Sequence, residues 1–522
     1  MKRVSAPMLI AGILVAQNSA LAAFTAGPWL QNVSKAGITI MWENNVATAG
    51  SVDYGTTTAY GSNTASTTTA TAGGTYVHKA FLTGLSAGTT YHYRAKVGTN
   101  ISGDFTFLTA PSDTINYNFL IGLYSDTHTP TAIGTTMMNY LLTTKKIEIC
   151  FACGDLVNSA GNTYSDVEAN IVQQDIATVA TKVPLYAALG NHDVSANWGG
   201  GDECRKFFDQ PKGINSDPAG FKGSYMLNYG GAAAIFIDWT RYQADIGGSL
   251  TSWLETQLSS AAYQNARFRF VCIHNAPYYE RWHVAGEGQT ECLGTLGLKN
   301  TYANLLKKYS VDATFSGHLH AYERGQQTNA GGYNTYFCVT GGGSYLEPQA
   351  PYAGDTVYSF ITQGEWQTTP ANFNGGVVNE VMTITVRPRY TAHGIGFDTL
   401  EDSAIARMHG FSGSGASYGV LDSFIMVHKF ILTTGVISRS TGGWTTPNVQ
   451  ISVTKEWVHV TLPTALRGVV RFFDITGRVR QQVAVAAATR EVAVSVATLP
   501  RGIYLLDLKG VGVQFTQTIV LR

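Results

Sequence analysis

Five short motifs in the middle of the chain carry residue types that bind metal ions. They are YSDTH at 124–128, CGDLVN at 153–158, GNHD at 190–193, VCIH at 271–274 and GHLH at 317–320. Their candidate ligands are Asp126, His128, Asp155, Asn191, His274, His318 and His320. Carboxylate, amide and imidazole groups suit divalent ions such as zinc, manganese and iron. The motifs therefore predict a site for two metal ions.

Two ions held about 3.5 to 4 Å apart can clamp a phosphoryl group, provided that one ligand bridges them. Asp155 is the natural bridge, because a carboxylate has two oxygens. The other ligands divide into one set for each ion: Asp126, His128 and His320 for the first, and Asn191, His274 and His318 for the second. Gly317 favours a loop from which His318 and His320 can diverge toward different ions.

Each motif ends an apolar run that is rich in β-forming residues. These runs cover 117–124, 147–153, 184–189, 268–273 and 313–315, and helical periodicity covers 164–180, 250–261 and 302–308. A single D-x-H or G-N-H motif often arises by chance, but five in order, each after a strand, are far more specific. Strand, ligand loop and helix in repetition predict an α/β fold whose site lies at the carboxyl ends of the strands.

The motif set resembles the metallophosphoesterase (calcineurin-like phosphoesterase) superfamily. GHLHAYER at 317–324 and VCIHNAPYYERWHVAGEG at 271–288 are similar to the purple acid phosphatase branch. The resemblance is strong over 115–345 and looser over 27–110. It implies an α/β fold, a four-layer metallophosphoesterase sandwich, flanked here by two all-β sandwich domains.

Position 158 departs from the purple acid phosphatase pattern. That branch has a tyrosine three residues after the bridging aspartate, which binds ferric iron and gives the colour, whereas this chain has Asn158. His128 can take the vacant place on the first metal, as in the wider superfamily. We therefore expect two divalent ions, namely zinc, manganese or ferrous iron, or a mixed pair.

The implied reaction is hydrolysis of a phosphoester by a hydroxide that bridges the two metals and attacks phosphorus in line. The resemblance implies that His192 meets the substrate and assists the leaving group. Asp193 would hold that imidazole protonated and oriented. His283 and Tyr322 are further candidates for substrate contact, the alternatives being an exposed loop histidine and a residue outside the pocket.

Two glycine-rich stretches are interpreted structurally. Gly341, Gly342 and Gly343 follow a strand-like run, but no helix with a Lys-Ser or Lys-Thr pair comes next, so a tight turn beside the site is expected in place of a phosphate-binding loop. His409 and the stretch 410–419 match no known spacing and are expected in loops.

The ends of the chain indicate secretion. Lys2 and Arg3, an apolar run over 8–16 and the small residues at 20–22 predict a signal peptide over 1–22. A β-rich module over 24–110 resembles a fibronectin type III domain and the purple acid phosphatase N-terminal domain. The catalytic domain is expected over 115–430 and a linker over 431–446. Residues 447–522 resemble the C-terminal sorting domain of type IX secretion, the alternative being an accessory sandwich.

The net charge of the chain limits the kinds of partner that it is expected to bind. The formal net charge of the 522 residues is zero, so a basic nucleic-acid surface is not indicated. The expected partners are a small phosphorylated substrate and the secretion machinery, which would place the protein outside the cell or on its surface. Cys204 and Cys292 could pair in such an oxidising compartment, whereas Cys150 and Cys153 are expected in the core.

These features predict a secreted binuclear metal-dependent phosphoesterase that hydrolyses phosphate monoesters. A phosphodiesterase or nucleotidase with the same site is the nearest alternative. A surface adhesin with an inactive phosphatase-like domain is the alternative from another class, and the complete ligand set argues against it.

Overall fold

The structure, a computed structural model, describes residues 22–113, 117–158, 163–193, 203–211, 223–238, 246–278, 298–344, 346, 378–394, 397–430, 450–453, 456–473, 479–499, 502–510 and 513–521. The linker expected over 431–446, His283, Cys292 and all but the last residue of the expected signal peptide lie outside these residues. The pairing of Cys204 with Cys292 therefore stays a prediction, although Cys204 itself is buried in helix α3 (Glu203–Lys206).

The N-terminal module consists of two antiparallel sheets. One has the order β1 (Phe24–Gln31), β2 (Gly37–Asn44), β6 (Tyr76–Thr83), β5 (Thr67–Ala70). The other joins β4 (Ser62–Ala65), β3 (Gly50–Gly55), β7 (Thr90–Val97) and β8 (Asn100–Ile101), with β9 (Phe105–Leu108) also on β7. Alternation along β7 buries Tyr91, Tyr93 and Ala95 in the core and leaves His92 half-exposed beside Asp104, as its sequence pattern predicts.

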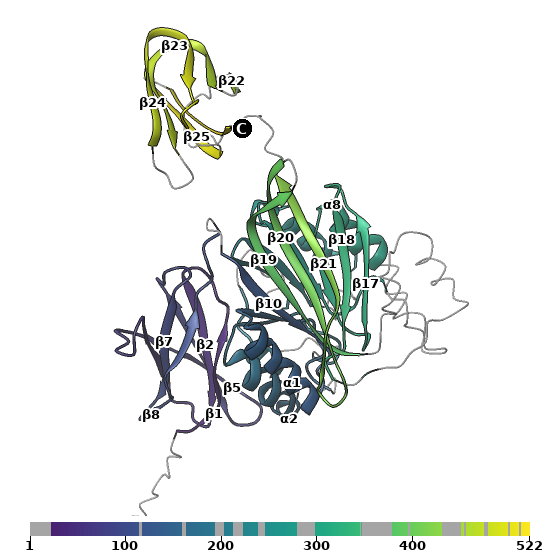
Figure 1. The fold of residues 1–522 in the computed structure, drawn as a ribbon. Helices are drawn as coiled ribbons and strands as arrows, with labels where there is room; N and C mark the ends of the chain where they lie inside the picture. Colours follow the sequence, from purple (N-terminus) through teal and green to yellow (C-terminus); the bar gives the residue numbers. More distant parts are fainter. Residues whose placement is uncertain are drawn as a thin grey trace, which may run out of the picture. The chain divides into compact units, whose positions relative to one another are not determined.

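The first motif-bearing sheet has six strands. Its order is β12 (Leu185–Ala187), β11 (Ile149–Ala152), β10 (Phe119–Tyr124), β19 (Asn379–Gly394), β20 (Phe397–Phe411), β21 (Ser417–Phe430). The strands β10, β11 and β12 are parallel, whereas β19 runs antiparallel to β10. Figure 1 shows β19, β20 and β21 as long strands beside β10.

The second motif-bearing sheet also has six strands. Its order is β13 (Tyr225–Tyr229), β14 (Ala232–Ile237), β15 (Phe268–Ile273), β16 (Ala313–Ser316), β18 (Asn334–Thr340), β17 (Tyr322–Thr328). The strands β14, β15, β16 and β18 are parallel neighbours. Side chains from both sheets, such as Phe151 and Phe236, share one buried cluster. Strands buried on both faces account for the continuous apolar runs in the sequence.

Helices link the strands and cover the sheets. They comprise α1 (Ala132–Asn139), η1 (Tyr140–Lys145), α2 (Tyr164–Val167), η2 (Glu168–Ala180), α3, α5 (Ser249–Ser259), α6 (Ala261–Gln264), η4 (Leu298–Ala303) and α8 (Asn304–Lys308). The helix predicted over 164–180 is observed as α2 continued by η2. The helix predicted over 250–261 ends earlier, because Ser260 leaves helical geometry and caps α6 by accepting a hydrogen bond from the Tyr263 N–H.

One part of the sequence interpretation was wrong. His409 and its neighbours were expected in a loop, but residues 397–411 form strand β20, and the His409 side chain is buried with a hydrogen bond to Thr383. Hydrophobic alternation there is weak, since small and charged residues interrupt it. Pairing with β19 and β21 supplies the backbone hydrogen bonds that make it a strand.

Buried polar contacts join the N-terminal module to the part of the chain that holds the motif-bearing sheets. The Trp29 indole donates to the Phe207 carbonyl, and the Gln31 amide donates to the Leu185 carbonyl. Thr39 donates to the buried Asp209 carboxylate at 2.7 Å. Because such groups are costly to leave unpaired, these contacts stabilise the module and the motif-bearing sheets as one compact unit.

The C-terminal strands form most of a second compact unit. Its sheet has the order β22 (Gln450–Val453), β23 (Trp457–Phe473), β25 (Gly502–Gly510), β26 (Val513–Leu521), with β24 (Val479–Ser495) also on β23. The expected hairpin is observed, since β23 and β24 pair antiparallel on either side of residues 474–478. No helix within the described part of the chain is long and apolar enough to cross a membrane.

Candidate metal centre

The five motifs meet because their strands are parallel neighbours. The motif loops follow directly on β10, β11, β12, β15 and β16. Parallel strands place their carboxyl ends at the same edge of a sheet, and the His318 N–H donates to the Asp126 carboxylate, which joins the loops of the two sheets at this point. Hydrogen bonds then tie one loop to the next: Asp126 N–H donates to the Gly154 carbonyl, and Gly317 N–H donates to the His274 carbonyl.

Asp126, His128 and His320 form the first group of potential ligands. The Nε2 atoms of the two histidines lie 3.1 Å apart, and Nε2 of His320 lies 3.4 Å from Oδ1 of Asp126. All three residues are buried. Two imidazole nitrogens and a carboxylate oxygen that converge in this way make a set of donors for one cation.

Asp155, His274 and His318 form the second group. Nε2 of His274 lies 3.0 Å from Oδ2 of Asp155, while Nδ1 of the same ring donates to the Cys153 carbonyl at 2.8 Å. A backbone acceptor on one nitrogen fixes the tautomer and directs the other nitrogen at the site, an arrangement common among metal-binding histidines. Oδ1 of Asn191 is buried and accepts no hydrogen bond from the described residues.

A single oxygen of Asp155 faces both groups. Oδ2 lies 3.0 Å from Nε2 of His274 and 3.9 Å from Nε2 of His128, which belongs to the first group. The other oxygen, Oδ1, accepts the backbone N–H of His192 at 2.9 Å. Both oxygens were expected to serve the bridge, and Oδ2 is the one that faces a histidine of each group.

Four of these residues have left-handed backbone conformations, which are rare outside glycine. The φ angles are 55° for Asp126, 47° for His128, 52° for Asp155 and 71° for His318. Each such conformation costs on the order of 1–3 kcal/mol and clusters at functional sites. Hydrogen bonds between the loops stabilise this left-handed conformation. The His128 N–H donates to the Asp155 carbonyl, and the His318 N–H donates to the Asp126 carboxylate.

Burial and neighbouring charges set the protonation of the cluster. Burial would raise the pKa of Asp155, but His274 beside it holds that pKa below its ordinary value, so the carboxylate stays ionised. Burial by itself would lower the pKa of His274, yet the Asp155 charge raises it to about 9. Burial lowers the pKa of His128 to about 4, which leaves a neutral imidazole with a lone pair.

The residues present fit two metal ions. The groups are built from imidazole nitrogens and carboxylate oxygens, Oδ2 of Asp155 faces a histidine of each, and the orphaned Asn191 carbonyl oxygen belongs to the same motif set. Buried polar atoms without a partner are costly unless a ligand satisfies them. This donor set suits zinc, manganese or iron better than calcium or magnesium, because half or more of each group is imidazole.

His192 lies beside the cluster, but Asp193 does not orient it as the sequence argument expected. Nδ1 of His192 lies 2.6 Å from the Asn158 carbonyl oxygen. The Asp193 carboxylate instead accepts the backbone N–H groups of Asp155, Leu156 and Gly190, at 2.7 to 2.8 Å. That expectation was wrong because adjacent side chains on a tight loop point in different directions.

Tyr322 lies in the protein core. Its ring is 1% exposed and its hydroxyl donates to Oδ2 of Asp422 at 2.7 Å, an oxygen that also accepts Nε of Arg324. The expected substrate contact does not fit this placement. Tyr322 is the first residue of strand β17, and its side chain belongs to the buried cluster that both motif-bearing sheets share. His283 lies outside the described residues.

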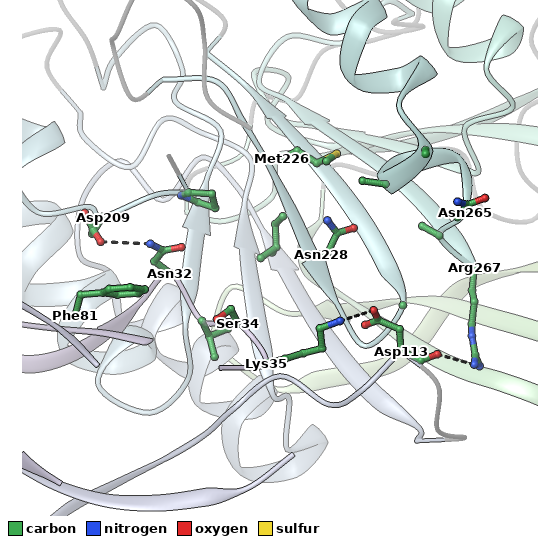
Figure 2. Close-up of a pocket in the computed structure, with 17 residues that line it drawn as sticks. Asn32, Ser34, Lys35, Phe81, Asp113, Asp209, Met226, Asn228, Asn265 and Arg267 are labelled. Carbon is green, nitrogen blue, oxygen red and sulfur yellow. Dashed lines mark hydrogen bonds and ion pairs between the residues drawn. The ribbon is translucent and has the colours of Figure 1, made fainter. Parts of the chain in front are cut away.

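A pocket of about 820 Å³ lies at the amino ends of the strands, between the N-terminal module and the second sheet (Figure 2). Gly231 and Arg267, which line it, directly precede β14 and β15, whereas the metal-binding motifs follow their strands. Lys35 pairs with the Asp113 carboxylate at 2.7 Å, and Arg267 donates to the Asp113 carbonyl. These polar groups are engaged with one another, and the pocket is not part of the metal centre.

Residues 119–322 match the family described as Calcineurin-like phosphoesterase, and residues 28–109 match the Purple acid Phosphatase N-terminal domain. Among curated proteins, the chain is 25% identical over 266 residues to Fe(3+)-Zn(2+) purple acid phosphatase 12 of Arabidopsis thaliana, covering 50% of this chain and 54% of that protein. It is 23% identical over 269 residues to a purple acid phosphatase of Glycine max, covering 50% and 55%. The chain thus spans little more than half the length of these relatives.

Two solved structures share the fold. Purple acid phosphatase PPD1 from yellow lupin (Lupinus luteus) seeds superposes with a TM-score of 0.56 and 19% identity, covering 77% of this chain and 74% of that one. A structure described as PhoD superposes with a TM-score of 0.53 and 13% identity, covering 80% and 94%. The fold is therefore of the metallophosphoesterase kind found in purple acid phosphatases.

Proposed function

We propose that this protein is a binuclear metal-dependent phosphoesterase that hydrolyses phosphate monoesters. The position of Asp155 is the observation that carries the proposal, because one of its oxygens faces imidazoles from both ligand groups, 3.0 Å and 3.9 Å away. A shared carboxylate is what two neighbouring cations require. The matches to calcineurin-like phosphoesterases and to purple acid phosphatases support the same reaction class.

Each ion has its own residues. Asp126, His128 and His320 would hold the first ion, Asn191, His274 and His318 the second, and Asp155 both. When bound, two divalent ions supply Lewis acidity, charge neutralisation at phosphorus and a water of lowered pKa. The protein contributes the fixed geometry, since the strained ligand loops are bound to one another through their backbones.

His192 is placed to act on the leaving group. Because Nδ1 donates to the Asn158 carbonyl, Nε2 is the nitrogen left for the substrate. It lies within the group formed by His128 and Asp155. A neutral ring in this tautomer can accept a hydrogen bond at Nε2, and only the protonated ring can donate one there. Assistance to a departing alkoxide therefore needs the imidazolium form of His192.

Divalent ions are favoured over a purple ferric centre. The residue at position 158 contributes its backbone carbonyl to His192, and its side chain is exposed, so no phenolate stands at this place. His128 belongs to the first ligand group and would take the place of that phenolate. Zinc, manganese, ferrous iron or a mixed pair fits this donor set.

The flanking parts support a secreted role. The N-terminal module, a two-sheet β structure that resembles fibronectin type III, would brace the catalytic sheets, with which it shares buried contacts. The C-terminal sheet, with its resemblance to type IX sorting domains, would serve export. The resemblances to fibronectin type III and to type IX sorting domains come from the sequence, as does the expected signal peptide.

One assay tests the reaction class. Purified protein, with its metals quantified, would be given the mono- and the di-(para-nitrophenyl) phosphate. We expect faster hydrolysis of the monoester, and loss of both metals and of activity in Asp155→Ala. Preference for the diester would point to the phosphodiesterase alternative. A fully metal-loaded protein that cleaves neither ester would favour the inactive adhesin.

A further inference from the structure

Residues 341–344, here called the glycine turn, lie wedged between two ligand loops. A Cβ on Gly341 would overlap the Leu319 carbonyl, between His318 and His320, and a Cβ on Gly343 would overlap the Ser125 carbonyl. Neither glycine has a left-handed φ. Glycine is therefore required here for close approach of backbones and not for a turn conformation.

Hydrogen bonds connect the glycine turn to both loops. The Ser344 hydroxyl donates to the backbone carbonyl of Asp126 at 2.9 Å, and Gly341 N–H donates to the Ala321 carbonyl at 3.2 Å. Asp126 is a member of the first ligand group and has a left-handed backbone. A displacement of the glycine turn would therefore displace the backbone of Asp126.

Asn379, the first residue of β19, holds the glycine turn in place. Its side-chain amide donates both hydrogens, to the Gly342 carbonyl at 3.0 Å and to the Ser344 carbonyl at 2.6 Å, and the side chain is buried. The next residue, Glu380, accepts hydrogen bonds from Thr340 Oγ1 at 2.8 Å and from Gly342 N–H at 3.3 Å. The start of β19 is therefore hydrogen-bonded to the glycine turn on one side, and the ligand loops contact the glycine turn on the other.

We propose that Asn379 is a positioning residue that sets the metal affinity of the site formed by Asp126, His128 and His320. The inference rests on the proposed function, because it concerns the first of the two metal positions. Asn379 acts through the Gly342 and Ser344 carbonyls and the Ser344 hydroxyl. The second position, around His274, receives no hydrogen bond from Asn379 or the glycine turn among the described residues.

The test is a titration of the chelator-stripped full chain with Zn²⁺, followed by competition with a chromophoric chelator. Unmodified protein should bind two ions, and His320→Ala identifies which binding event belongs to the first position. Asn379→Ala should weaken that event by about 10- to 100-fold, the usual effect of losing an outer support of a metal ligand, and leave the other within about twofold. At saturating Zn²⁺, kcat and KM should recover, because no ligand or substrate contact has been altered.

Thr383→Val is the matched control. Thr383 is a buried residue of the same strand, and its hydroxyl bonds to His409, away from the glycine turn. It should leave both Zn²⁺ affinities unchanged. Ser344→Ala removes only the hydroxyl link to Asp126 and should weaken the first event in the same direction, which keeps the proposal testable if Asn379→Ala does not fold.

Three outcomes would overturn the inference: unchanged affinities in Asn379→Ala and Ser344→Ala, equal weakening of both events, or the same effect from Thr383→Val. The titration needs no substrate. Failure of unmodified protein to bind two ions would instead count against the proposed function. The two results are therefore distinguishable.

Discussion

The carboxylate of Asp193 accepts the backbone N–H of Asp155 at 2.8 Å. The same carboxylate accepts the N–H groups of Leu156 and Gly190. It thereby joins the loop that carries the shared ligand to the loop that carries Asn191. The role of this motif residue is to hold backbone in a left-handed conformation, and not to orient the neighbouring His192.

Asp193→Asn should loosen the Asp155 loop. The substitution turns one acceptor oxygen into an NH₂ group that faces backbone N–H donors, so the buried donors lose their partner. We expect the free energy of unfolding to fall by about 1–3 kcal/mol and the affinity for both ions to decrease. Urea unfolding and metal analysis measure the two effects. Asp166→Asn in α2 is a control for metal affinity, because this half-buried carboxylate accepts the Thr163 hydroxyl and lies outside the ligand motifs, so both ion affinities should stay unchanged.

His192→Ala should separate catalysis from metal binding. Although His192 lies near His128 and Asp155, the proposed ligand sets do not need it, and its role at the leaving group predicts that kcat falls by about 10² to 10⁴. Metal content should stay near that of the unmodified protein. The measurements are steady-state kinetics on a monoester and metal analysis of the same sample. A loss of metal equal to the loss of rate would show that His192 is a ligand.

Metal removal should destabilise the catalytic sheets. Ions that bind the folded chain alone stabilise it by mass action, by about 2.7 kcal/mol for each site at a hundred times its Kd. Chelation should therefore lower Tm, and Zn²⁺ or Mn²⁺ should restore it. In Asp155→Ala, Tm should respond to neither treatment. An unmodified protein with a chelator-insensitive Tm would contradict a metal centre built from strained loops.

Asp175 should make stability depend on pH. It lies buried on η2 against the hydroxyls of Tyr124 and Thr127, and burial raises its pKa to about 8. Between its unfolded pKa near 3.8 and this value the folded state alone keeps the proton. The free energy of unfolding should therefore fall as pH rises across that window, by at most about 1.4 kcal/mol per pH unit, and level off above it.

Asp175→Asn tests this pH dependence. The amide is neutral at every pH and has nearly the same size as the carboxyl group, so the slope of unfolding free energy against pH should become shallower. A remaining slope is expected from Asp193, because burial and the Asp155 charge raise its pKa to about 7. Denaturant titrations of chelator-stripped protein between pH 5 and 8 give the slopes. Identical slopes in the two proteins would exclude Asp175 as their source.

Tyr322→Phe should affect stability and leave substrate binding unchanged. The hydroxyl donates a buried hydrogen bond to the Asp422 carboxylate, which also pairs with Arg324. Its loss should lower the free energy of unfolding by about 1.5–3 kcal/mol, because the acceptor is charged. KM for a monoester should stay unchanged. A several-fold rise in KM would indicate that Tyr322 contacts the substrate after all.

Residue types and their order along the chain were enough to predict the α/β catalytic core, because ligands that follow apolar strands must converge where parallel strands end. The grouping of Asp126 with His320, and of Asp155 with His274, is observed as the motif order predicts. Helix 164–180 and strand 268–273 are likewise seen, since hydrophobic periodicity is a local signal.

Tertiary structure alone decided how those ligands are held. Asn379 and Ser344 stand outside every motif, and the link from Asn379 through Ser344 to Asp126 depends on β19 pairing with β10. The direction of the Asp193 carboxylate depends on left-handed backbone at Asp155, which no side-chain pattern reveals. Sequence determines which groups can bind a metal, because that is a property of each side chain. Their positions depend on hydrogen bonds between segments far apart in the chain, which exist only once the sheets have formed.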